Sequence, residues 1–400
     1  MAEVKNRVFR YEIQIAHEGR WLIRNVYSDE RDAINRARAM VHTERMAEAI
    51  KVLQFRTAPN GFSTEKELLM IDRLEAYRKQ EFQVAPVDQV DVCTDYTDLM
   101  KLDARRAMEK LLRPYLGVEC LTPTEFLHMS SYQREIDRKG RLVESALHTV
   151  ARLQAKDMGK QTNERYEELT EMARQIQMLA QDFTYENRDL PLLDGSNFKA
   201  VAEAIEQRVP ADRVEFFMTA AVCQYLMQYR AMMDKLERLV SLLGSSDRRG
   251  IAILDRLFAD AIAAPGLMRD LLGPQISLAD HITLCLNVLR GKYGVGEVGG
   301  QRFLVVVSHL ISGGLCPEAA DAIQQHLVRA FVSEAPLDKR ELDPVSQRRH
   351  LENIVQEFAN DPHLDSCREE LDKAIDRRRR RLRSALLRSE GLEELADQAL

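Results

Sequence analysis

The chain has 400 residues, of which 45% are apolar and 30% are charged, with a formal net charge of −6. This length predicts two or three domains, and the balance of apolar and charged residues excludes a chain that is disordered throughout. The mild negative charge excludes a globally basic surface for nucleic acid or anionic membranes.

The composition favours helices, because Leu, Ala, Arg, Glu and Met are abundant and aromatic residues make up only 6% of the chain. The six cysteines contain no CxxC pair, so we expect free thiols in a reducing cytoplasm and no zinc ribbon. The N-terminus has no apolar signal region, and the longest apolar runs, such as 303–307, are too short to span a bilayer. We therefore predict a cytoplasmic protein with no membrane span.

Residues 1–70 have a pattern found nowhere else in the chain and predict a small α+β domain with ββαβ order. Alternating residues rich in Val, Ile, Tyr and Phe predict its strands, and a glycine-containing turn separates the first two. The predicted elements are strands at 8–16, 21–28 and 49–57 and a helix from about 29 to 45. Two interpretations stay open for the end of this region: a fourth short strand near 62–69, or a charged helix over 64–82.

Residues 71–120 are predicted to form a linker and connecting helices. The stretch 83–97 has no sustained period and includes a proline, which indicates a linker or a covering strand. A helix follows at about 98–114. We expect it to end near Pro114, because proline removes a backbone hydrogen bond from a helix interior.

Residues 121–183 are predicted to form a long helical hairpin or coiled-coil-like segment. Thr122 can cap the first helix, Pro123 suits its first position, and Glu125 completes a capping box. Leu, Met and Ile then recur at spacings of three and four, with weak points at Gly140 and at 157–159. This pattern favours a homo-oligomer that associates through these helices.

Residues 184–335 predict an all-α domain, and residues 336–400 predict C-terminal helices with a basic cluster. Prolines lie between the amphipathic segments, where an all-helical region tolerates them. The predicted helices lie at 197–208, 211–243, 247–263, 265–272, 277–290, 301–312, 317–332, 346–360 and 365–389, followed by a short tail helix. The predicted fold class is therefore mainly α, with a small N-terminal α+β domain and a multi-helix, bundle-like body.

A glycine-rich segment at 291–300 is the sharpest local motif. Gly294, Gly296 and Gly299 spell G-x-G-x-x-G, a pattern that holds phosphate where it follows a strand and opens a helix. Here an amphipathic helix precedes the motif, and no βαβ pattern surrounds it. We interpret the segment as an interhelical loop, with binding of a nucleotide or another anion as the alternative.

Five consecutive arginines occupy residues 377–381. On a helix they cover every face, so at least one must lie along apolar neighbours, and acidic residues before and after them predict salt bridges. The main interpretation is a solvated, salt-bridged terminal helix, and contact with an acidic partner is the alternative. The candidates for partner binding are Arg377, Arg378, Arg380 and Arg381, together with Trp21 in the N-terminal domain.

No local pattern indicates catalysis, a metal site or a cofactor. The nine histidines show no HxxxH, HExxH or HxH spacing, and no GxSxG motif occurs. Cys223 and Cys285 lie on apolar helix faces, which favours buried, inert thiols. We therefore predict no cofactor and no metal, while a site assembled from distant residues stays open.

The leading functional hypothesis is a non-enzymatic helical adaptor, scaffold or regulatory protein that acts through contacts with other proteins. Its N-terminal domain would bind one partner through a strand edge or a helix face, and the helical body would hold another or self-associate. We do not expect nucleic acid as a partner. Two alternatives stay open: a small-ligand sensor that uses the loop 291–300, and an enzyme whose site is not visible in the sequence.

Overall fold

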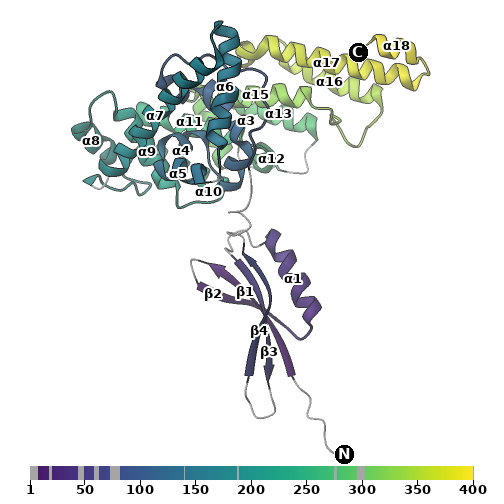
Figure 1. The fold of residues 1–400 in the computed structure, drawn as a ribbon. Coiled ribbons are helices and arrows are strands. Elements are labelled where there is room, and N and C mark those ends of the chain that lie inside the picture. The colour runs from purple at the N-terminus through teal and green to yellow at the C-terminus, as the bar shows by residue number, and fades with distance from the viewer. Residues whose placement is uncertain are drawn as a thin grey trace, which may run out of the picture. The chain divides into compact units, whose positions relative to one another are not determined.

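The computed structural model describes residues 8–17, 20–43, 49–57, 63–72, 82–138, 140–186, 189–273, 277–294 and 302–399. The chain divides into two compact units, Met1–Glu81 and Phe82–Leu400. The first is a four-stranded sheet with one helix, and the second consists of helices (Figure 1). The predicted fold class, mainly α with a small N-terminal α+β domain, is thereby confirmed.

The N-terminal unit is an antiparallel sheet with strand order β2-β1-β3-β4. Its elements are β1 (Val8–His17), β2 (Arg20–Tyr27), α1 (Glu30–Thr43), β3 (Ala49–Thr57) and β4 (Ser63–Asp72). Helix α1 lies along one face of the sheet (Figure 1). Ile13 of β1 and Ile50 of β3 are fully buried against Ala33 and Ala37 of α1, whose small side chains allow helix and sheet to approach closely.

Strand β4 decides between the two interpretations of the end of this region. The fourth strand is confirmed as β4, Ser63–Asp72, and the predicted charged helix is wrong over Thr64–Asp72. The local sequence STEKELLMID is rich in helix formers, but β4 pairs with β3 along its whole length and places Leu69 opposite the buried Val52. Pairing and burial thus override local propensity. Residues 73–81 of the predicted helix lie outside the described residues.

The second unit begins with helices that follow the linker region. These are η1 (Tyr96–Met100), α3 (Leu102–Glu119), α4 (Pro123–His128), α5 (Ser130–Arg138), α6 (Leu142–Met158) and α7 (Thr162–Glu186). The predicted capping box at Thr122 and Glu125 is present, with Thr122 Oγ1 accepting from the Glu125 amide at 3.2 Å. The expected weak points also coincide with breaks, since α5 ends before Gly140 and α6 ends at Gly159.

The rest of the second unit is also helical. It contains α8 (Phe198–Arg208), α9 (Val214–Leu226), α10 (Met232–Leu242), η3 (Leu243–Ser245), α11 (Arg248–Ala263), α12 (Leu267–Leu272), α13 (Leu278–Leu289), α14 (Arg302–Ser312), α15 (Pro317–Val332), α16 (Pro344–Phe358), η4 (Pro362–Cys367), α17 (Arg368–Ser389) and α18 (Glu393–Gln398). Of the 13 residues of α9, 11 are buried, so this helix lies inside the main core. Helices α11 and α15 pack against each other within the same core.

Two helix predictions in this unit are wrong. Pro114 lies inside α3, which continues to Glu119. The amide of Ala85 donates to Leu111 O at 3.0 Å, so a neighbouring segment supplies a donor close to the place where proline removes one. The segment 82–95 that carries Ala85 forms no strand, which leaves the linker interpretation.

The predicted single helix 211–243 is two helices, α9 and α10. No glycine or proline marks the break at 227–231, so the local sequence carries no stop signal. The break is instead associated with a tertiary contact, because Lys235 of α10 forms an ion pair with Glu125 of α4.

Two further observations bear on the surroundings in which the chain folds. All six cysteines are free thiols. Among the described residues, no single helix is long and apolar enough to cross a membrane, while α14 and α15 pass that test only as a pair bent by 110°.

Candidate functional site

Strand β2 is one edge of the N-terminal sheet, and half of its side chains are apolar and solvent-exposed. The exposed fractions are 39% for Trp21, 52% for Leu22, 59% for Ile23 and 53% for Val26. Isolated exposed apolar residues are ordinary, but three of these four, Trp21, Ile23 and Val26, pair with β1 residues that lie on the face opposite α1, and only Leu22 lies on the α1 face. We call Trp21, Leu22, Ile23 and Val26 the β2 edge.

Trp21 is held in place by its neighbours on the face of the sheet opposite α1. The register pairs Trp21 with Ala16 of β1, which in turn pairs with Ala49 of β3, so two small side chains lie beside the indole. The Lys51 ammonium of β3 lies 4.3 Å from the centroid of the Trp21 ring, a cation–π contact. Trp21 therefore presents an oriented aromatic surface at the edge.

The opposite edge of the sheet has different chemistry. Strand β4 carries Glu65, Lys66 and Glu67, which are all exposed. Charged side chains on an edge strand discourage pairing with another strand, because pairing would desolvate them. Strand β2 has only two charged residues, Arg20 at its start and Arg24, which is the extra residue of a bulge in the β1–β2 register.

The glycine-rich loop is only partly covered by the structure. Gly294 is described, whereas Gly296 and Gly299 lie outside the described residues. Gly291, just after α13, has φ +69°, and a Cβ there would lie 2.5 Å from Ser312 Cβ. Glycine at 291 is thus required by the turn itself. Anion binding by this loop stays a prediction.

The arginine cluster lies on α17, and its members have different surroundings. Arg378 is buried, and its guanidinium donates to Ser333 O at 2.8 Å and to Ala330 O at 3.2 Å, at the end of α15. It therefore satisfies carbonyl groups that the end of α15 leaves free. Arg381 donates to Val332 O of the same region at 2.9 Å. Arg377 and Arg380 are exposed, and partner binding by them stays a prediction.

Inside the helical unit, one buried charged cluster is fully paired. Arg105 Nε donates to Asp260 Oδ1 at 2.9 Å, and its Nη2 contacts Glu318. The other oxygen of Asp260 accepts from the amide and the hydroxyl of Thr124 at 2.9 and 2.6 Å. These bonds connect α3, α4, α11 and α15. We call Arg105, Asp260, Thr124 and Glu318 the arginine–aspartate cluster, and its saturated bonding marks it as structural.

A second polar group of the helical unit, which is partly buried, has no charged hydrogen-bond partner among the described residues. His281 and Cys285 lie four residues apart on one face of α13, and His326 faces them from α15. Their ligand atoms, two imidazole nitrogens and the Cys285 Sγ, all lie within 4.8 Å of one another. His281 Nε2 and His326 Nε2 are 2.6 Å apart. We call these three residues the His–Cys–His cluster.

Burial sets the protonation of this cluster. Burial lowers the pKa of His281, and it lowers the pKa of His326 to about 4, with His281 and Arg329 acting in the same direction. Both rings are therefore neutral near pH 7, and one must donate to the lone pair of the other. Burial raises the pKa of the Cys285 thiol to about 12, so without a cation beside it the sulfur stays protonated.

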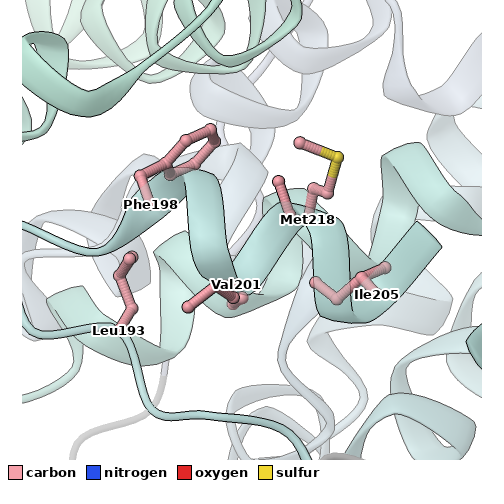
Figure 2. Close-up of a pocket in the computed structure, with 7 residues that line it drawn as sticks. Leu193, Phe198, Val201, Ile205 and Met218 are labelled. Atoms are coloured by element: carbon pink, nitrogen blue, oxygen red, sulfur yellow. The ribbon is translucent and has the colours of Figure 1, made fainter. Parts of the chain in front are cut away.

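A shallow hollow lies between α8 and α9 (Figure 2). Its lining is wholly apolar, and the hollow is too narrow to admit a water molecule. The lining residues are Leu193, Phe198, Val201, Ala202, Ile205, Met218 and Ala221. It therefore offers neither room nor polar groups for a ligand.

The comparisons with known proteins give no relative for this chain. No family model matches it, and neither a curated protein nor a solved structure matches it.

The His–Cys–His cluster is the feature that our sequence analysis missed. The spacing His281-x3-Cys285 was available, since residues four apart on a helix share a face. Taken alone, Cys285 on an apolar helix face indicates only a buried thiol. His326 had no signal in the sequence, because only the packing of α13 against α15 brings it close.

Proposed function

We propose that this protein is an adaptor that binds an extended segment of another protein along the β2 edge. The supporting observation is the contrast between the two edges of one sheet: β4 carries exposed charges, whereas β2 carries four exposed apolar side chains. Edge strands present unpaired backbone N–H and C=O groups, and proteins commonly bind by adding a strand to such an edge.

The chemistry of β2 favours a particular kind of partner. The strand contains two arginines, Arg20 and Arg24, and no acidic residue, and Lys51 lies over Trp21. An incoming strand with both apolar and acidic residues on the face opposite α1 would satisfy both features, since its apolar side chains would cover Trp21 and Ile23 while an acid approached Lys51. We therefore propose an acidic, apolar extended segment as the partner.

The helical unit would hold this module in a stable body that acts through contacts rather than through catalysis. Its six free thiols agree with a reducing compartment, and we propose the cytoplasm as the site of action. Self-association through residues 121–183 stays a proposal for the same unit.

A photo-crosslinking amino acid placed in the full-length chain tests the proposal. It should replace Ile23 on the β2 edge in one variant and Lys66 on β4 in a matched control. We expect a defined crosslinked protein with the position-23 variant, and its loss when Val26→Lys is added. Equal crosslinking at both positions, or none at either, would contradict the proposal. A crosslink between two copies of this chain would assign the edge to self-association instead.

A further inference from the structure

We propose that His281, Cys285 and His326 bind a zinc ion. Two neutral imidazoles and one thiolate are donors that zinc prefers, and histidine and cysteine together are the usual ligands of protein zinc sites. The proposal goes beyond partner binding by β2, and neither depends on the other.

The placement of the donors suits a metal. His281 and Cys285 are one helical turn apart on α13, and His326 comes from α15, so two packed helices hold all three side chains. In a tetrahedral zinc site, bonds of ~2.0–2.1 Å to nitrogen place two nitrogen ligands about 3.3 Å apart. The two Nε2 atoms are 2.6 Å apart, so the rings must separate slightly to admit the ion. Small rotations of two half-buried rings provide that movement.

The cluster is otherwise unexplained as a structural feature. Cys285 is fully buried, and its thiol has no hydrogen-bond partner among the described residues. The contact between the two rings gives each histidine a single bond, and their Nδ1 atoms have no partner in the described part of the chain. By contrast, every charged member of the arginine–aspartate cluster is paired. A metal would supply the cluster with the partner that its three donors share.

One charged group near the cluster opposes the binding of a cation, and another favours it. Arg329, one turn after His326, disfavours positive charge there, as its effect on the His326 pKa shows. Zinc displaces the proton of Cys285 on binding, and the resulting thiolate offsets part of this repulsion. In many zinc sites a protein group accepts a hydrogen bond from the second ring nitrogen of each histidine ligand. Here water must accept the hydrogen bonds of the two Nδ1 atoms.

The fourth coordination position has no protein ligand among the described residues. No further His, Cys, Asp or Glu of those residues joins the group. His281 and His326 are each only partly buried, so water reaches the open side. Three protein ligands with a water in the fourth position is the arrangement of zinc sites that exchange ligands.

Cobalt(II) titration of the metal-free full-length chain tests the proposal, because cobalt occupies zinc sites and reports its ligands by absorption. We expect one cobalt per chain, visible bands typical of tetrahedral coordination, and a near-ultraviolet band from thiolate-to-cobalt charge transfer. Added zinc should abolish these bands. A wild-type chain that shows no charge-transfer band would overturn the proposal.

Matched variants assign the band to residues. Cys285→Ala should abolish the charge-transfer band, whereas Cys223→Ala, which removes another fully buried helical thiol, should keep it. His326→Gln should weaken cobalt binding at least tenfold, and His309→Gln on the exposed side of α14 should not. Loss of the band in Cys223→Ala as well as in Cys285→Ala would contradict the assignment. Metal analysis of the chain as purified should find zinc, and copper in its place would overturn the choice of zinc.

Discussion

The arginine–aspartate cluster and the His–Cys–His cluster of the helical unit differ in how their charges and hydrogen-bond donors are satisfied. In the arginine–aspartate cluster, Asp260 accepts from Arg105 and Thr124, and every bond lies within the chain. In the His–Cys–His cluster, two neutral rings share one contact, and a buried thiol has no hydrogen bond among the described residues. The first cluster stabilises the fold through bonds within the chain, whereas the second keeps ligand atoms that can still bind a metal ion.

The largest loss of stability should come from disrupting the arginine–aspartate cluster. Asp260→Ala leaves Arg105 buried without its carboxylate, and we expect the free energy of unfolding to fall by about 3–5 kcal/mol. Urea unfolding measures the loss. Asp270→Ala is the control, because Asp270 and its neighbour Arg269 are both exposed, and it should cost about 1 kcal/mol or less. Equal losses in the two variants would show that the buried cluster is not structural.

Zinc bound to the His–Cys–His cluster should change the free energy of unfolding by a smaller amount. At free zinc 100-fold above the dissociation constant, mass action raises the free energy of unfolding by about 2.7 kcal/mol. Urea unfolding with and without zinc measures the gain in the wild type and in His326→Gln. The variant should show none of it. A gain of the same size in both would place the zinc elsewhere in the chain.

Acid should reveal a buried histidine that belongs to neither cluster. Burial lowers the pKa of His128 to about 3, with Arg256 and Arg105 acting in the same direction and its hydrogen bond to Thr124 O opposing them. Below its ordinary value of 6.5, the unfolded chain binds a proton that the folded chain does not. The free energy of unfolding should therefore fall as the pH drops from about 6.5 towards 3, by about 1.4 kcal/mol per pH unit.

Unfolding of the wild type and of His128→Gln at pH 7, 6 and 5 isolates this contribution. The two proteins should converge in stability as the pH falls, because only the wild type loses the contribution of a neutral imidazole. A constant difference between them across that range would mean that the ring at position 128 is solvated and titrates normally.

The smallest effect on stability should come from the β2 edge. Ile23→Lys replaces a side chain that is 59% exposed, so we expect a change within about 0.5 kcal/mol. Partner binding should nevertheless be lost, because the lysine would have to be desolvated by an incoming strand. Lys66→Ala on β4 is the control, and should change neither stability nor binding. A large loss of stability in Ile23→Lys would mean that the edge is packed rather than free.

The elements with a local signal were predictable from the sequence. The capping box at Thr122, the break at Gly159 and the alternating residues of β1 and β3 all depend on neighbours in the chain. The break between α9 and α10 has no such signal, and β4 forms only because β3 offers an edge to pair with. Those features depend on tertiary contacts that a single sequence does not display.

The same division applies to the candidate sites. Trp21 was a candidate from the sequence, and its exposure on β2 follows from the strand order. Five adjacent arginines look alike in the sequence, yet only packing decides that Arg378 is buried under the end of α15. Two of the three residues of the His–Cys–His cluster, His281 and Cys285, were visible as a helical spacing. The approach of His326 was not, since it comes from a different helix.

X-ray absorption at the zinc edge of the metal-loaded, full-length chain tests the central contrast most directly. If the His–Cys–His cluster binds the zinc ion, the spectrum should contain nitrogen ligands at about 2.0–2.1 Å and one sulfur at about 2.3 Å. The sulfur should disappear in Cys285→Ala. A spectrum with only oxygen and nitrogen neighbours in the wild type would contradict the account.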